Sequence, residues 1–111
     1  MRADDAIRLR HMLEAAEKAV DFSVGKTRKD LDTEQILVLA LIKCVEIIGE
    51  AANKVSDESR QDLPAIPWAD IVGMRHRLIH GYFDINLDIV WRTVTQELPA
   101  LIEELRKAQS N

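Results

Sequence analysis

Apolar residues recur along the first quarter of the chain at spacings of three and four, the period of an α-helix. They are Leu9, Met12, Leu13, Ala16, Ala19, Val20 and Val24. This pattern predicts a first helix that is capped by Asp4 or Asp5 and ended by Gly25, which is free to adopt the left-handed conformation. The charged run at residues 26–30 predicts a solvated connecting loop, and a phosphate-binding loop is the alternative.

The second predicted helix opens at Asp32 or Thr33, runs to about Val55 and is apolar around most of its circumference. A helix of this kind must be covered on several sides, so the pattern favours self-association of a domain this small. Its polar residues form one stripe, made of Lys43, Glu46, Glu50 and Asn53. That stripe is either a solvent face or the border of a functional site.

Proline and glycine divide the rest of the chain. Residues 56–60 predict a short helix that Pro64 and Pro67 interrupt, and residues 68–80 predict a longer one that stops at Gly81. After a connector at 82–85, Asn86 is expected to cap the last helix. Pro99 should kink or divide that helix, and the tail beyond residue 107 is expected to fray. The whole pattern predicts one all-α domain over residues 1–111, an up-and-down antiparallel bundle of four to five helices.

Composition supports this fold class, because the 111 residues include only four glycines and three prolines. The single cysteine, Cys44, cannot form an internal disulfide and fits a reducing compartment. The charged N-terminus lacks a signal-peptide core, and the longest apolar run, residues 36–42, is too short for a membrane span. We therefore expect a soluble, cytoplasmic protein with no membrane partner. The net charge of −4 excludes a general basic coat for nucleic acid, but a local basic site remains open.

Chemically active side chains crowd into eight positions of the segment 68–83: Arg75, His76, Arg77, His80 and Tyr82. An arginine suits phosphate oxygens, and a histidine can move a proton near neutral pH. On one continuous helix Arg75 and His80 would be roughly 140° and ~7.5 Å apart, bordering one groove. The pair is a minimal set for metal-free RNA cleavage in which the 2′-hydroxyl of the substrate is the nucleophile. A two-fold dimer would double these groups.

Each of these residues also has a structural interpretation. Arg75 can pair with Glu46 or Glu50, and His80 can cap the C-terminus of its own helix. His76 and His80 have the i, i+4 spacing of two zinc ligands, but no convincing third ligand accompanies them, so no metal site is predicted. Tyr82 is either an aromatic ring packed at the rim or a modification site.

The spacing Arg75, four residues, His80, one residue, Tyr82 resembles the signature of the HepT-like HEPN proteins, ribonuclease toxins that pair with a minimal nucleotidyltransferase. The agreement extends to other short segments along nearly the whole chain. They are Pro67-Trp68, Gly73-Met74-Arg75, His80-Gly81-Tyr82-Phe83, Val90-Trp91 and Gly49-Glu50-Ala51-Ala52-Asn53.

The resemblance implies a helical bundle that forms a homodimer and cleaves RNA, either tRNA or mRNA, without a cofactor. Arg75 and His80 would be catalytic, with His76 and Glu50 as supporting residues. Tyr82 would accept AMP from a cognate MntA-like nucleotidyltransferase antitoxin, which uses ATP and magnesium. This chain departs from the common pattern at His76, where Asn or Asp is frequent, and at Gly81, where Glu is frequent. The alternative function is a non-catalytic helical binding subunit of a nucleotidyltransferase.

Overall fold

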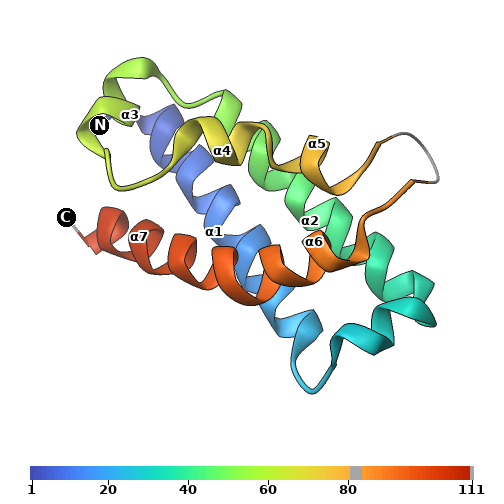
Figure 1. Ribbon diagram of the computed structural model, residues 1–111. Coiled ribbons are helices and arrows are strands. Elements are labelled where there is room, and N and C mark those ends of the chain that lie inside the picture. Colours follow the sequence, from blue (N-terminus) through green and yellow to red (C-terminus); the bar gives the residue numbers. More distant parts are fainter. Residues whose placement is uncertain (81–83, 111) are drawn as a thin grey trace.

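The computed structural model describes residues 1–80 and 84–110, and within them every regular element is helical (Figure 1). The all-α prediction is confirmed. The elements in order are α1 (Ala3–Ser23), the 3-10 helix η1 (Arg28–Asp32), α2 (Gln35–Asn53), α3 (Asp57–Asp62), α4 (Trp68–Val72), α5 (Met74–Leu78), α6 (Leu87–Arg92), the π-helical segment η2 (Thr93–Glu97) and α7 (Leu98–Ser110).

The core lies where α1 packs against both α2 and α7 (Figure 1). The largest side chains with almost no exposed surface come from each of these helices and from α4 to η2 as well: Met12, Leu41, Ile48, Ile71, Leu78, Val90, Val94, Leu98 and Leu105. Burial of apolar surface on this scale is the main term that stabilises the fold. Among the described residues, no helix has the length and apolar character needed to cross a lipid bilayer.

The predicted cap of α1 is wrong. The helix begins at Ala3, with Arg2 at the N-cap, and Asp5 lies inside it. The Asp5 carboxylate is buried and accepts hydrogen bonds from Ser56 and Ser59, more than fifty positions away. Asp5, which was predicted as a possible cap of this helix, therefore forms a long-range contact instead. The end of the helix was predicted correctly, since Gly25 has a φ of 75°.

The charged segment after Gly25 is more ordered than the predicted loop. Thr27 and Asp30 form a capping box that opens η1. Lys26 pairs with Glu34 at 2.8 Å, while Arg28 pairs with Asp88 at 2.6 Å and with Asp32. Carboxylates of this chain thus already engage two of the basic residues, which gives no support to the phosphate-binding alternative.

This 3-10 turn also moves the start of α2 along the chain. Asp32 ends η1 and Thr33 follows it, so the N-cap position of α2 falls on Glu34 rather than on either of them. The helix ends at Asn53, two residues before the predicted end. The short helix that follows was predicted correctly, because the Ser56 hydroxyl oxygen accepts a hydrogen bond from the backbone N–H of Ser59 at the start of α3.

The helix predicted over residues 68–80 is wrong in two respects. It is divided into α4 and α5 at Gly73, and it ends at Leu78 rather than at His80. Ile79 has an extended backbone and forms an antiparallel bridge with Ile85. Two backbone hydrogen bonds of 2.8 Å, from His80 N–H to Asp84 O and from Asn86 N–H to Leu78 O, hold residues 78–80 against residues 84–86. These contacts replace the last turn of the predicted helix.

The predicted Asn86 cap is confirmed, since its side-chain oxygen accepts a hydrogen bond from the backbone N–H of Ile89. The expected effect of Pro99 appears one turn earlier, as the π-helical segment η2. There the N–H of Leu98 bonds to the carbonyl of Thr93, five residues back. A wider turn before proline accommodates a residue that has no N–H to donate. Helix α7 continues to Ser110, three residues past the point at which the tail was expected to fray.

Candidate functional site

Helix α5 presents three consecutive basic-type side chains to solvent. Arg75, His76 and Arg77 are exposed, whereas Met74 and Leu78 at the ends of the helix are buried. The apolar pair, four positions apart on one face, fixes the helix on the core. The polar residues between them are therefore held on a rigid, anchored turn of helix.

A close approach of α2 and α4 positions this turn. A Cβ built on Gly49 would lie 3.5 Å from the carbonyl oxygen of Ile71 and 3.6 Å from that of Val72, so the end of α4 lies directly against α2. Beside this contact is a shallow pocket of about 230 Å³, bordered by both helices and by α5. Its lining residues are Glu46, Gly49, Glu50, Asn53, Val72, Arg75 and His76.

Arg75 forms an ion pair across this pocket. Its Nε lies 3.3 Å from Oε1 of Glu46, and Lys43 approaches the other oxygen of Glu46 at 4.0 Å. Of the two partners that the sequence allowed, the structure selects Glu46. Glu50, the predicted supporting residue, lines the same pocket but has no ion-pair partner within the described ranges. Pairs as exposed as this contribute about 0–1 kcal/mol to stability, so Arg75 remains available to a competing anion.

The structure places His80 differently from the sequence prediction. It lies two residues beyond the end of α5, exposed, with its backbone N–H bonded to Asp84. The helical angle and rise expected between Arg75 and His80 therefore do not apply, and His80 is not among the residues that line the pocket with Arg75 and His76. It does not cap the helix either, since Ile79 occupies that position.

The i, i+4 helical spacing that His76 and His80 would need to act as two zinc ligands does not apply, because α5 ends at Leu78, before His80. Across residues 1–80 and 84–110, no group of three His, Cys, Asp or Glu side chains is arranged to hold a metal ion. Tyr82, together with Gly81 and Phe83, lies outside the described residues. Its role as an AMP acceptor stays a prediction.

Arg77 faces away from the Glu46 pocket. Its Nη2 donates to the carbonyl oxygen of Asp70 at 3.4 Å and lies 3.5 Å from Oε1 of Glu97. Arg75 and His76 therefore lie on the side of α5 that faces α2, whereas Arg77 lies on the side that faces α7.

The sequence left the partner of Arg75 undecided between Glu46 and Glu50, and the structure shows that it is Glu46. The sequence did indicate this pair of candidates, because Glu46 and Glu50 are i, i+4 on the polar stripe and hence share a face. Only the position of α5 across α2 shows which of the two carboxylates meets Arg75.

Comparison with known proteins agrees with the resemblance seen in the sequence. Residues 12–108 match the family described as Ribonuclease HepT-like. A protein of Caldanaerobacter subterraneus subsp. tengcongensis, named as a candidate RNase, is 34% identical over 99 residues, which cover 89% of this chain and 88% of the relative. One from Thermococcus cleftensis, named a probable ribonuclease HepT, is 33% identical over 89% of this chain and 93% of the relative.

A third relative, from Methanocaldococcus jannaschii, is 38% identical over 107 residues, but these cover only 48% of its length. Its name combines a gamma-glutamylcyclotransferase with a candidate RNase. No solved structure matches the chain.

Proposed function

The chain belongs to the HepT-like ribonuclease family, and from this premise we propose that it is a metal-independent endoribonuclease that uses Arg75 and His80. The observation that carries the proposal is the exposed basic turn of α5, which is anchored by Met74 and Leu78, together with the exposed His80 two residues beyond its end. These groups are accessible to a large polyanion, although the protein as a whole is acidic.

In the proposed reaction Arg75 binds the scissile phosphate and stabilises the charge that develops on its oxygens. His80 removes the proton of the substrate's 2′-hydroxyl, whose oxygen attacks the adjacent phosphorus. The bond from phosphorus to the 5′-oxygen breaks, that oxygen takes up a proton, and a 2′,3′-cyclic phosphate is left. His76 and Glu50 would support the site from the pocket beside Arg75.

RNA cleavage in EDTA tests this directly. Purified wild-type protein, without any partner, should cut a tRNA or mRNA substrate, and His80→Ala should lose at least a hundredfold in rate, as expected for loss of a proton-transferring group. His11→Ala is the matched control, because His11 is also exposed but lies on α1. Absence of cleavage by the unmodified wild-type protein would reject the proposal.

We further propose that the active form is a homodimer joined through the exposed face of α2. Three large apolar side chains on that helix remain uncovered: Ile36 is 86% exposed, Leu39 52% and Ile47 36%. Phe22 of α1 borders the same face, across a groove of about 720 Å³. One side of α2 carries residues 36, 39, 43, 47 and 50 in succession. Because Glu50 lines the same pocket as Arg75, a second copy that is seated on this side would lie beside Arg75.

The proposed off-switch is transfer of AMP to Tyr82 by a cognate MntA-like nucleotidyltransferase antitoxin with ATP and magnesium, in the cytoplasm. The phenolic oxygen would attack the α-phosphorus of ATP, pyrophosphate would leave, and the phenolic proton would pass to solvent. Tyr82 follows His80 by two positions, so the added phosphate would carry negative charge next to the proposed site. Intact mass after incubation with the partner should rise by one adenylyl group, and Tyr82→Phe should not change.

The alternative, a non-catalytic binding subunit of a nucleotidyltransferase, is favoured by the net charge of −4, which offers RNA little long-range attraction. The same two assays separate the functions. Loss of cleavage that follows AMP addition supports the toxin, whereas AMP addition to a protein that never cleaves RNA supports the binding subunit.

A further inference from the structure

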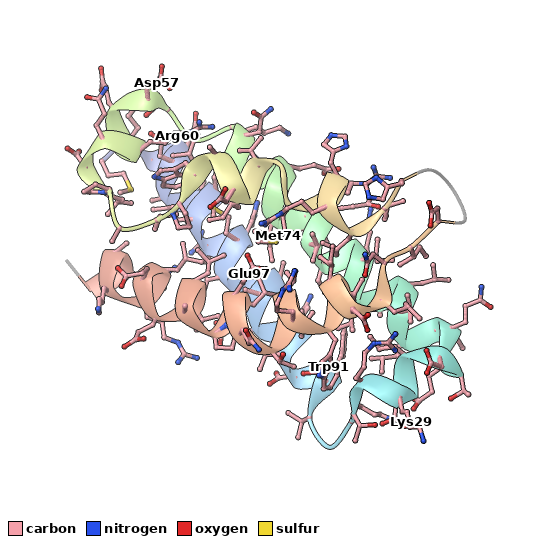
Figure 2. The ribbon with its side chains drawn as sticks, in the orientation of Figure 1. Lys29, Asp57, Arg60, Met74, Trp91 and Glu97 are labelled. Carbon is pink, nitrogen blue, oxygen red and sulfur yellow. The ribbon has the colours of Figure 1, made fainter. Side chains whose placement is uncertain are left out.

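A second groove lies on the side of α4 and α5 that faces α7, away from the Glu46 pocket. It has a volume of about 360 Å³ and separates α4 and α5 from the helix formed by η2 and α7. Met74 and Glu97 mark its two sides (Figure 2). Its apolar lining combines buried and exposed side chains, namely Ala65, Pro67, Ile71, Met74, Ala100 and Leu101.

The rim of this groove is acidic. Four of the residues that line it are carboxylates, and none is Lys or Arg: Asp70, Glu97, Glu103 and Glu104. Glu97 already accepts a cation, since Arg77 reaches it from the edge of the groove, and Glu104 pairs with Lys107 at 3.3 Å. Asp70 and Glu103 have no ion-pair partner within residues 1–80 and 84–110. The groove therefore carries surplus negative charge around an apolar floor.

We propose that this groove docks a segment of a partner protein that carries an apolar side chain flanked by Lys or Arg. The apolar side chain would lie on Met74 and Leu101, and its basic neighbours would pair with Asp70 and Glu103. Complementary charge of this kind steers association and fixes the register of the partner. The same carboxylates repel phosphate groups, which disfavours RNA or an anionic lipid surface as the occupant.

Such docking would contact the segment that carries the proposed RNA site. Met74 lines the groove, and its neighbour Arg75 lines the pocket on the opposite side of α5. The docking proposal does not rest on RNA cleavage, because it is tested by binding alone, and a protein that never cuts RNA would leave it standing.

Fluorescence anisotropy with a synthetic peptide tests the surface. The probe is a labelled peptide with one tryptophan between two pairs of arginines, and the control peptide has glutamines in place of the arginines. The double variant Asp70→Asn/Glu103→Gln should bind the basic probe at least tenfold more weakly than wild type. The matched control Asp57→Asn/Glu58→Gln removes the same charge from α3 (Figure 2) and should bind like wild type.

A second variant tests the groove itself without changing the charge. Ala100 is exposed on α7 and lines the groove, so Ala100→Trp should fill the groove and block binding while the circular dichroism spectrum stays helical. Equal binding of the neutral peptide, or equal loss in the groove and control double variants, would overturn the proposal.

The NMR signals of the three methionines show where the peptide binds. With ¹³C-labelled methyl groups, the signal of Met74 should shift as the peptide is added, while that of the fully buried Met12 should not. Met1 lines a different cavity, between α1 and α7, and should also stay in place. A shift at Met1 in place of Met74 would assign the peptide to that cavity and contradict the docking site.

Discussion

At the scale of single residues, Asp5 joins the start of α1 to the start of α3 through a buried carboxylate. It accepts hydrogen bonds from the Ser56 hydroxyl at 2.6 Å, the Ser59 hydroxyl at 2.7 Å and the Ser56 backbone N–H at 3.0 Å. The Ser56 hydroxyl bond, followed by those from Ser59 and the Ser56 backbone, lowers the pKa of Asp5 from 3.8 to about 2. The charged carboxylate is thus stabilised by the folded state.

Asp5→Asn should destabilise the protein by about 1–3 kcal/mol, because the amide group brings donors to a place where three donors already converge. The pKa of Asp5 is lower in the folded than in the unfolded protein, so its contribution is present above about pH 4 and is lost as the pH falls toward about 2. Urea denaturation from pH 7 to pH 2 measures this. The variant should lose that part of the acid sensitivity, whereas Asp4→Asn, at an exposed neighbour, should behave like wild type.

Glu46 is the second residue with a specific expectation. Because its carboxylate occupies Arg75 at 3.3 Å, an RNA phosphate must compete with it for the guanidinium. Glu46→Gln, made in a His80→Ala background that prevents cleavage, should bind RNA up to about fivefold more tightly, the factor that corresponds to an exposed pair of about 1 kcal/mol. Anisotropy with a labelled RNA at low salt gives the affinity. Glu58→Gln on α3 is the control, and weaker binding by the Glu46 variant would show that the pair instead holds Arg75 in place.

At the scale of elements, two glycines should respond in opposite directions to the same substitution. Gly49 lies inside α2, where an added methyl group meets two carbonyl oxygens at ordinary contact distance, so Gly49→Ala should stabilise the helix by up to about 1 kcal/mol. Gly25 has a φ of 75° and open space around it, so Gly25→Ala should cost about 1–2 kcal/mol through backbone strain alone. Chemical denaturation of both variants compares them. Destabilisation by Gly49→Ala would mean that α2 and α4 pack more closely than these contacts show.

The division of the segment 68–80 also belongs to this scale. Local propensity favours one helix through His80, but Ile79 instead pairs with Ile85 and Asn86 bonds back to Leu78. The backbones that flank positions 81–83 are thereby paired with each other. This pairing, rather than a continued helix, holds the backbone of His80.

At the scale of the whole molecule, the uncovered face of α2 predicts the assembly state. Wild-type protein should have twice the chain mass of 12.6 kDa by light scattering at micromolar concentration. Ile36→Lys should shift it toward monomer, because a charge would be buried in the apolar interface. The control Ile7→Lys changes an exposed apolar residue near the N-terminus of α1, outside the proposed interface, and should leave the dimer intact. A wild-type monomer would contradict the proposed dimer.

What the sequence determined by itself rests on interactions within about one helical turn. Helical periodicity, the short helix near residues 56–60, the cap at Asn86 and the left-handed turn at Gly25 are set by neighbouring residues, so the sequence alone predicted them. The candidate residues Arg75, His76 and His80 were also visible as a local crowding of reactive groups. Their spatial relation was not.

Only the tertiary structure decided that Asp5 accepts hydrogen bonds at the start of α3, that Arg75 pairs with Glu46 and that His80 lies beyond the end of its predicted helix. The first two contacts join residues about 30 to 50 positions apart, and the third depends on a backbone pairing that competes with the helix. Long-range contacts of this kind depend on how the helices pack on one another, and helix packing is not encoded in any single window of the chain.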